Sequence, residues 1–388
     1  MPVVVTDVQQ STWIVIAVFL SAVLLGFRKS QHKDLFPVPV TQELKGLGML
    51  AIVFAHISYM LVDDNRFLYP LSIAAGVGVD LFLFMSGYGL TVGMLKRQLP
   101  AMEFFHRRLI KVFIPFWLVI GTLFIADPFI ADRHYTVGYV LQSLLGYFPT
   151  AIPTHDVNSP FWYITWMLLF YVLFPFLFLR QFPWITAILL AGIANAVAIT
   201  NPLNMQANWL HSLHTYAFSL GILLAWWMQR SPDTVKTLEW FRNQSGGIGR
   251  YLVLVFGLGS AGYMACHNTP SDWPTLSKAL EALSLDRGNV IGQTTSLLAM
   301  AGAILYFAFK RLDNRFLYWF GVYSYETYLL HWPLMSRYDV FFRYLPAWAA
   351  TLAWLAAFLA IGWGLQRITA PIGTWVDQLG NSRQRNAV

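Results

Sequence analysis

Residues 45–62 read KGLGMLAIVFAHISYMLV, an apolar run of the length that a helix needs to cross the hydrocarbon core of a bilayer. Similar runs of about 17 to 22 residues recur along the whole chain. The composition agrees, because 57% of the 388 residues are hydrophobic and only 12% are charged. The charged share is about half that of a soluble globular chain. The sequence therefore predicts an all-α fold, a polytopic bundle of membrane helices.

We expect about eleven transmembrane helices, with ends that are uncertain by a few residues. The predicted spans are 12–27, 45–62, 73–95, 109–127, 161–179, 183–200, 208–228, 251–267, 289–309, 317–335 and 346–366. The stretch 136–148 is apolar but too short to span, so it is either re-entrant or interfacial.

The basic residues lie mainly in alternate loops of this arrangement. If the N-terminus is outside, the outer side carries six of the 26 Lys and Arg residues, which leaves 20 for the inner side. The outer six are Arg66, Arg133, Lys278, Arg287, Arg337 and Arg343. This asymmetry satisfies the positive-inside rule and predicts an N-out, C-in orientation.

The predicted organisation has three parts. Residues 1–40 form an extra N-terminal transmembrane helix and a basic cytoplasmic loop, residues 41–370 form the main membrane domain, and residues 371–388 form a cytoplasmic tail. The net charge of +7 is not gathered on one domain, so we expect no nucleic-acid partner. The single cysteine, Cys266, excludes an intramolecular disulfide and a metal site built on paired thiolates.

His56 is the first ionisable residue inside a predicted span, and such residues are candidate functional sites because they are costly in lipid. It follows Lys45 by eleven residues, close to three helical turns, so both side chains lie on one face about 16 Å apart. A neutral imidazole is a suitable general base for activating a hydroxyl. The alternative is a histidine that only packs against a neighbouring helix.

Asp80 lies in the next predicted span, within GVGVDLFLFMSGYGL. A buried carboxylate needs a partner, and we expect His56 or an Arg. Gly76, Asp80 and Gly87 share a helix face, where a neighbouring helix or a ligand can come close. The sequence fits a carboxylate that orients an imidazole, and it equally fits a polar clasp between helices.

Further candidates lie in three later segments. Arg107, Arg108 and Lys111 precede the fourth span and suit a phosphate-rich ligand, although ordinary anchoring at the inner surface also explains them. Trp162 and Tyr163 begin the fifth span, where an interfacial aromatic belt is the alternative. The tenth span contains an acid and a base, Glu326 and His331, while His211 and His214 at the start of the seventh span carry little weight.

These residues together resemble the acyltransferase-3 family of integral-membrane acyltransferases that modify bacterial surface glycans. The resemblance rests on short motifs in the family's order: residues 45–56, a basic residue and a His separated by ten residues; 78–82, GVDLF; 86–88, SGY; 108–111, with Lys in place of the second Arg; and 324–333, SYETYLLHWP. It covers about residues 41–366. The chain departs from many members at Met167, Leu168 and Leu169, where Glu, Glu and Gln usually stand.

The resemblance implies an acyl-coenzyme A co-substrate on the cytosolic side and a carbohydrate hydroxyl, on the cell surface or on a lipid carrier, as acceptor. It implies that His56 and Asp80 are catalytic, that Glu326, His331, Trp162 and Tyr163 line the acceptor side, and that no metal or bound cofactor is used. Donor binding is expected of Lys45, Ser86, Tyr88, Arg107, Arg108 and Lys111. The expected location is the bacterial inner membrane, in contact with membrane lipid.

Two other functions fit intramembrane ionisable residues. A transporter or flippase of a lipid-linked saccharide would use His, Asp and Glu as a proton relay, and inverted repeats or paired broken helices would favour it. The sequence predicts neither feature. A receptor or scaffold would tolerate substitution of both His56 and Asp80.

Overall fold

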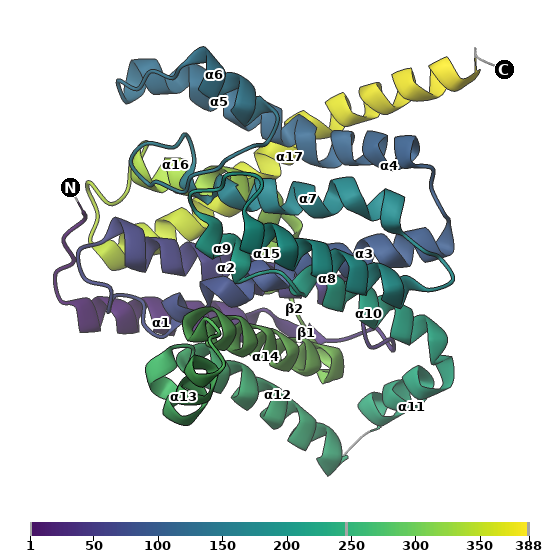
Figure 1. The fold of residues 1–388 in the computed structure, drawn as a ribbon. Coiled ribbons are helices and arrows are strands. Elements are labelled where there is room, and N and C mark those ends of the chain that lie inside the picture. The colour runs from purple at the N-terminus through teal and green to yellow at the C-terminus, as the bar shows by residue number, and fades with distance from the viewer. Residues whose placement is uncertain (1, 245–246, 386–388) are drawn as a thin grey trace. The chain divides into compact units, whose positions relative to one another are not determined.

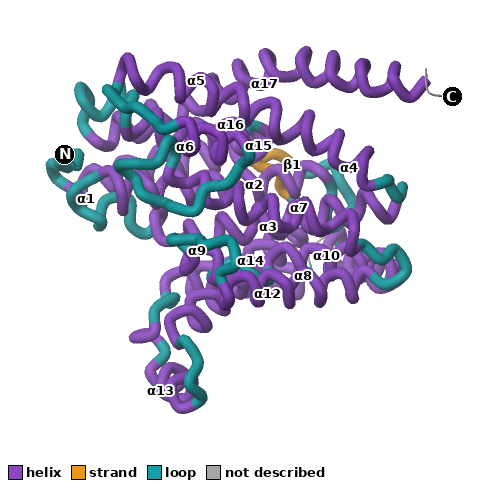
Figure 2. Tube along the Cα trace, turned by 45° about the horizontal axis from the view of Figure 1, so that its top comes forward, coloured by secondary structure: helices purple, strands orange, loops and turns teal. Residues whose placement is uncertain are grey.

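The computed structural model describes residues 2–244 and 247–385, and most of these residues are helical (Figures 1 and 2). The chain divides into two compact units. The first consists of Met1–Lys96 and Leu177–Val322, and the second of Arg97–Phe176 and Tyr323–Val388. The predicted fold class, an all-α bundle of membrane helices, is confirmed.

The first unit contains a small antiparallel sheet of two strands, in which Phe27 pairs with Asn314 and Lys29 with Leu312. Its elements are α1 (Val8–Leu25), β1 (Phe27–Lys29), α2 (Val38–His56), a π-helix (Ile57–Leu61), a 3-10 helix (Leu71–Ala74), α3 (Ala75–Lys96), α8 (Pro183–Thr200), α9 (Asn208–Ser212), α10 (Ala217–Arg230), α11 (Pro232–Asn243), α12 (Ile248–Cys266), a 3-10 helix (Pro270–Asp272), α13 (Pro274–Ala282), α14 (Arg287–Phe309), β2 (Leu312–Asn314) and α15 (Arg315–Val322).

The second unit is built from two segments that are far apart in sequence. Its elements are α4 (Ala101–Arg108), a π-helix (Leu109–Phe113), α5 (Ile114–Ile130), α6 (Val137–Leu144), a 3-10 helix (Ser159–Phe161), α7 (Trp162–Leu177), α16 (Ser324–Ser336) and α17 (Ala347–Arg385). The segment 136–148 thus contains a short helix, α6, whose Val137 and Leu141 side chains are exposed.

Nine helical stretches in the described part of the chain are long and apolar enough to cross a membrane, which supports a multi-pass membrane protein. They are Val8–Leu25, Val38–Leu61, Leu71–Lys96, Ala101–Ile130, Ser159–Leu177, Pro183–Thr200, Ile248–Cys266, Arg287–Phe309 and Ala347–Val376. Each overlaps one of the predicted spans. The orientation stays a prediction.

The other two predicted spans, 208–228 and 317–335, are helical but interrupted. Residues 213–216 separate α9 from α10, and Tyr323 separates α15 from α16. Each piece is then shorter than the roughly 20 residues that cross a bilayer. The predicted count of eleven spans is therefore not confirmed at these two positions.

Glycines allow helix backbones in the first unit to touch. A Cβ at Gly87 would lie 2.0 Å from the carbonyl oxygen of Phe218, and one at Gly221 would lie 2.2 Å from that of Phe84. α3 and α10 therefore cross at a reciprocal pair of glycines, as is common between membrane helices. This crossing fixes α10 against the helix that carries Asp80.

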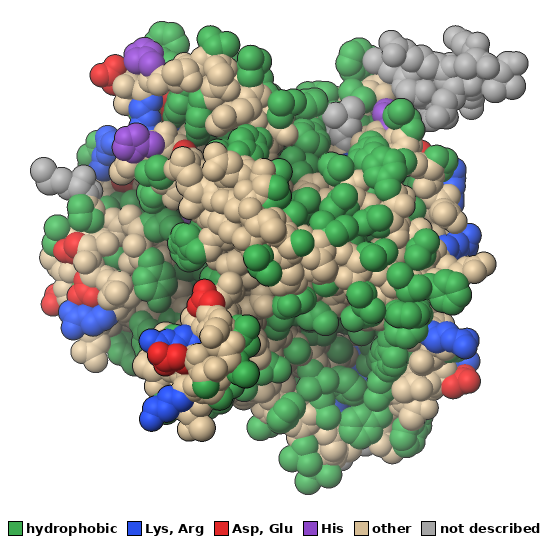
Figure 3. Space-filling view, in the orientation of Figure 1, with side chains coloured by type: hydrophobic (Ala, Val, Ile, Leu, Met, Phe, Trp, Pro, Cys, Tyr) green, Lys and Arg blue, Asp and Glu red, His purple; other side chains and the backbone are tan. Residues whose placement is uncertain are grey.

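The outer faces of several helices are apolar. α12 exposes Leu252, Val255 and Phe256, and α8 exposes Ile188 and Ile199. Figure 3 shows hydrophobic side chains over the visible surface of these helices, with charged side chains gathered near α13. Such faces are suited to contact with lipid.

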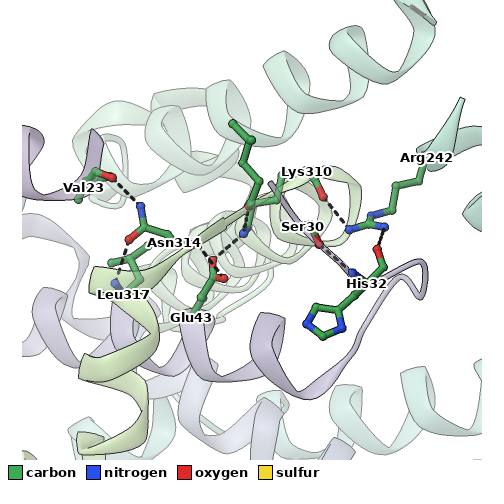
Figure 4. A network of polar contacts seen from close by, with 9 residues as sticks. Val23, Ser30, His32, Glu43, Arg242, Lys310, Asn314 and Leu317 are labelled. Atoms are coloured by element: carbon green, nitrogen blue, oxygen red, sulfur yellow. Dashed lines mark hydrogen bonds and ion pairs between the residues drawn. The ribbon is translucent and has the colours of Figure 1, made fainter. Parts of the chain in front are cut away.

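A buried polar network holds the ends of α2, α11 and α14 together near the small sheet (Figure 4). Lys310 Nζ lies 2.6 Å from Glu43 Oε2, and Asn314 N donates to Glu43 Oε1 at 2.9 Å. Arg242, of which only 1% is exposed, donates to the carbonyl oxygens of His32 and Lys310, both at 2.9 Å. Buried charges are tolerated here because each has a partner.

Candidate active site

Asp80 on α3 is fully buried, and both of its carboxylate oxygens have a partner. His214 Nδ1 lies 2.7 Å from Oδ1, and Ser296 Oγ donates to Oδ2 at 2.5 Å. The three side chains come from α3, from the interruption between α9 and α10, and from α14. Because a carboxylate accepts, Nδ1 of His214 carries the proton, and Nε2 is the nitrogen that can accept one. We call these three residues the Asp80 cluster.

The partners of Asp80 are therefore His214 and Ser296, and not His56 or an Arg as we expected. α2 and α3 run in opposite directions, since the π-helix after His56 contacts the 3-10 helix before α3 (Figure 1). They cross at Gly48 and Gly78, where a Cβ on Gly78 would lie 2.5 Å from the Gly48 oxygen. At 1.5 Å per residue, His56 is about 12 Å from this crossing in one direction and Asp80 about 3 Å in the other.

The predicted small-residue face around Asp80 is present. A Cβ on Gly76, one helical turn before Asp80, would lie 3.6 Å from Ser296 Oγ and 3.7 Å from His214 Cε1. The glycine thus leaves room for the two partners of the carboxylate. On the same face, Gly87 admits the backbone of α10.

The interruption that places His214 is stabilised from α14. Gln293 Nε2 donates to the Ser212 carbonyl oxygen and to Thr215 Oγ1, both at 2.8 Å. Backbone groups freed by a break inside a membrane need such partners. His211 is also fully buried, with Nδ1 3.1 Å from the Ala207 carbonyl oxygen. The sequence carried one signal that we gave little weight, two histidines three residues apart in an apolar segment.

His56 is the last residue of α2 and immediately precedes the π-helix Ile57–Leu61. Short π-helical segments occur frequently at functional sites. Lys45 and His56 lie in one continuous α-helix, so the predicted spacing of about 16 Å on one face is retained. The helix begins at Val38, seven residues before the predicted boundary, which places Lys45 inside the helix and not at its end.

Tyr88 on α3 is a predicted donor residue with two described contacts. Its hydroxyl lies 3.7 Å from the sulfur of Met228 on α10, and its ring makes an edge contact with Phe36 at 5.0 Å. Ser86 lies half-buried two residues earlier. The glycine between them, Gly87, forms the helix crossing, so this motif has at least one structural role.

In the second unit, the predicted basic cluster divides into two kinds of residue. Arg107 is exposed and pairs with Glu103 at 2.7 Å. The guanidinium of Arg108 lies over the rings of Phe104 and Tyr171, at 5.7 and 5.8 Å, and its Nε has no hydrogen-bond partner among the described residues. Lys111 is exposed and lies in the π-helix Leu109–Phe113. Arg108 is therefore the best placed of the three to bind an anion.

Two of the predicted acceptor residues contact Tyr328 on α16. Its ring lies 5.5 Å from that of Tyr163 and 6.1 Å from that of His331. Trp162 contacts Tyr163 at 6.3 Å and is only 9% exposed, which argues against an interfacial belt at this position. Glu326 is buried, and its Oε2 has no hydrogen-bond partner among the described residues.

His331 is fully buried and held by backbone carbonyls. Its Nδ1 lies 2.9 Å from the Tyr328 oxygen and 3.2 Å from the Thr327 oxygen. Because a carbonyl only accepts, Nδ1 is protonated and Nε2 is the acceptor nitrogen. His214 and His331 therefore carry the proton on the same ring nitrogen, Nδ1, although the partners of Nδ1 differ.

A further buried carboxylate, Asp127 on α5, which the sequence did not single out, contacts the segment 131–136 and the residues that follow α16. Asp127 accepts a hydrogen bond from Tyr135 at 2.5 Å and another from Tyr338, and Arg337 Nε lies 3.3 Å away. Burial, together with the bond to Asp127, raises the pKa of Tyr135 to about 12. The two terminal nitrogens of Arg337 donate to the backbone carbonyl oxygens of Asp156 and Val157, so we assign the group a structural role.

Comparison with known proteins shows a match to the acyltransferase domain family over residues 44–367. The chain belongs to this acyltransferase family. No curated protein and no solved structure matches it. The predicted resemblance is confirmed, and all the predicted site residues of the acyltransferase lie inside the matched region, as do His214 and Ser296.

The match begins shortly before Lys45 and ends within α17. Helix α1 and the loop before α2 of the acyltransferase lie outside it. The polar groups of this loop, including His32, are therefore not covered by the family match.

Proposed function

We propose that the protein transfers an acyl group, acetyl in its simplest form, from cytosolic acyl-coenzyme A to a hydroxyl of a surface or lipid-linked carbohydrate. The observation that carries the proposal is the continuous helix that holds Lys45 and His56 on one face, in a chain that belongs to an acyltransferase family. The charge asymmetry of the loops supports an N-out, C-in orientation in a bacterial inner membrane.

Donor binding is assigned to residues that can meet phosphate or the arm that bears the thioester. A guanidinium that already lies over aromatic rings, as in Arg108, loses little freedom when it binds a phosphate oxygen. The full set is Lys45, Ser86, Tyr88, Arg107, Arg108 and Lys111.

The chemistry assigned to His56 is general base catalysis. Its imidazole takes the proton of the acceptor hydroxyl while the hydroxyl oxygen attacks the thioester carbon. As the carbon–sulfur bond breaks, the imidazolium returns the proton to the departing thiolate, which gives the ester and free coenzyme A. Asp80 acts with His214 and Ser296 as a second acid–base group, because its carboxylate supports a proton on that imidazole.

The acceptor is assigned to the aromatic and polar residues of the second unit. Trp162 and Tyr163 offer ring faces and edges of the kind that pack against a sugar, while Glu326 and His331 offer hydrogen-bonding groups to its hydroxyls. The buried Oε2 of Glu326, with no described partner, supports a polar ligand at this place.

Mass spectrometry of the surface polysaccharide, with and without the gene, tests the proposal. We expect each modified sugar to lose the mass of one acyl group when the gene is absent, and the gene with His56→Ala to fail to restore it. Protein levels and thermal unfolding of the variant are measured alongside. An acyl group trapped on His56 after incubation with donor alone would make His56 an acyl carrier instead of a base.

A second outcome separates the proposal from transport of a lipid-linked saccharide. A flippase would change the amount of polysaccharide at the surface and leave its acylation per sugar unchanged. Restoration of full acylation by His56→Ala would contradict the proposed chemistry.

For donor binding, Arg108→Ala should raise the concentration of acyl-coenzyme A that half-saturates the reaction, and no change would leave Arg108 as an anchor at the membrane surface.

A further inference from the structure

A cavity of about 240 Å³ lies in the first unit beside the small sheet. Its lining consists of Ser30, Gln31, His32, Lys33, Asn243 and Arg311. Three of these six residues are basic, the other three are neutral hydrogen-bonding residues, and none is acidic. Among the described residues, no carboxylate is ion-paired with His32, Lys33 or Arg311.

A buried cation, Arg242, binds the backbone of the loop 30–33 that forms part of this cavity. Arg242 donates through Nη1 to the carbonyl oxygen of His32 at 2.9 Å and to that of Lys33 at 3.4 Å. Asn243 Nδ2 donates to the same Lys33 oxygen at 3.0 Å. Figure 4 shows Arg242 reaching the backbone of His32, whose imidazole points away from it. The carbonyl oxygens, which would repel an anion, are thus occupied by Arg242 and Asn243.

The other side of the loop is fixed by the sheet. Ser30 N donates to the Arg311 carbonyl oxygen at 2.9 Å, one step beyond the pair of Lys29 with Leu312. Ser30 Oγ accepts from the backbone nitrogen of His32 at 3.3 Å. These bonds use backbone atoms of Arg311 and His32 and leave their side chains for the cavity. A site with its donors placed in advance loses little entropy on binding.

We propose that this cavity binds a phosphate group. A phosphate offers oxygens that match the guanidinium of Arg311, the ammonium of Lys33 and neutral donors such as the Asn243 amide. Ordinary anchoring of a basic loop at a membrane surface does not require a buried arginine to hold the backbone of that loop. The loop precedes α2, the helix that carries Lys45 and His56.

Two sources can supply such a phosphate, the nucleotide part of acyl-coenzyme A or the headgroup of an anionic lipid. The assignment to the nucleotide rests on the proposed function, whereas the phosphate site itself does not. The loop residues of the cavity lie outside the family match, whereas Asn243 and Arg311 lie inside it.

The test compares a double variant, Lys33→Gln with Arg311→Gln, with the single control Lys236→Gln. Lys236 is an exposed lysine on α11 that is not part of the cavity lining. The two substitutions remove side-chain charge only, because the backbone hydrogen bonds of the loop are retained. Binding of coenzyme A and of 3′-dephospho-coenzyme A is measured by calorimetry on protein in neutral phosphatidylcholine nanodiscs, without any turnover.

We expect the double variant to bind coenzyme A about tenfold more weakly than the control, the effect of losing charge-assisted hydrogen bonds at a partly exposed site. If the double variant binds 3′-dephospho-coenzyme A as tightly as the control does, the 3′-phosphate of coenzyme A occupies the cavity. If the double variant loses affinity equally for both ligands, the diphosphate occupies it. Thermal stabilisation by added phosphatidylglycerol that is lost only in the double variant would identify a lipid headgroup. If the double variant matches the control in all these measurements, the proposal is overturned. Retained coenzyme A binding without acyl transfer would overturn the proposed function alone.

Discussion

The seventh and tenth apolar segments each contain a buried histidine, but the two histidines have different partners. His214 places Nδ1 against the carboxylate of Asp80, and His331 places Nδ1 against the carbonyl oxygens of its own helix. The described partner of the His214 ring is therefore a negative charge, whereas the described partners of the His331 ring are neutral dipoles. From this difference we expect proton transfer at His214 and hydrogen bonding at His331.

The largest expected effect comes from removing each imidazole in turn. His214→Ala leaves Asp80 buried with Ser296 as its described partner, and breaking a buried charge pair costs about 3 to 5 kcal/mol. His331→Ala removes the described contacts with carbonyl oxygens that already belong to a helix, and we expect a loss of about 1 to 3 kcal/mol. Unfolding of both variants in the same detergent measures the difference. Equal losses would mean that the carboxylate does not distinguish the two sites.

Asp80→Asn tests the same distinction without creating a cavity. An asparagine has one acceptor oxygen where the carboxylate has two, and its amide nitrogen donates. With that nitrogen turned toward His214, Nδ1 becomes the acceptor and the imidazole proton moves to Nε2. Proton acceptance at Nε2 is then lost, and we expect a fall in acyl transfer of about 100-fold or more, about 2.7 kcal/mol. The rate is measured with saturating donor. A variant that folds and keeps its full rate would reduce the Asp80 cluster to a polar clasp.

Much of the fold follows from the sequence because a bilayer demands apolar helices of one length. Nine predicted spans are uninterrupted helices for that reason. The break at residues 213–216 contains no Gly or Pro from which it could be predicted. The freed carbonyl oxygen of Ser212 accepts a hydrogen bond from Gln293, about eighty residues further along the chain. The partner of Asp80 was missed for the same reason, since His214 and Ser296 are distant in sequence and meet it only through helix packing.

Local sequence patterns predicted spacings within one helix better than they predicted contacts between helices. The spacing of Lys45 and His56 is retained because it depends on one helix alone. The π-helices after His56 and Arg108 have no recognisable sequence signal, since they depend on how neighbouring helices take up one extra residue. Tyr325 illustrates the dependence, because its hydroxyl donates at 2.8 Å to the carbonyl oxygen of Val112 in the second π-helix.

A smaller effect is expected at the third member of the Asp80 cluster. Ser296→Ala removes one hydrogen bond to a buried carboxylate and should destabilise the protein by about 2 kcal/mol. Ser260→Ala is the matched control, because Ser260 Oγ donates only to the Gly257 oxygen of its own helix at 3.1 Å, and its removal should cost less than about 0.5 kcal/mol. Thermal unfolding compares the two. Equal shifts would show that the second oxygen of Asp80 does not depend on Ser296.

The smallest effect is expected beside His331. The Tyr328 hydroxyl donates at 2.6 Å to the Pro160 carbonyl oxygen, while its ring lies next to the imidazole. Tyr328→Phe keeps the ring and removes a neutral hydrogen bond, which predicts a loss of about 1 kcal/mol. Tyr344→Phe, at an 81% exposed position, should change nothing measurable. If His331 acts only as a neutral hydrogen-bonding group, Tyr328→Phe should shift the unfolding temperature and leave the acyl-transfer rate at saturating donor within about twofold. A larger fall in rate would bring His331 into the chemistry and end the contrast with His214.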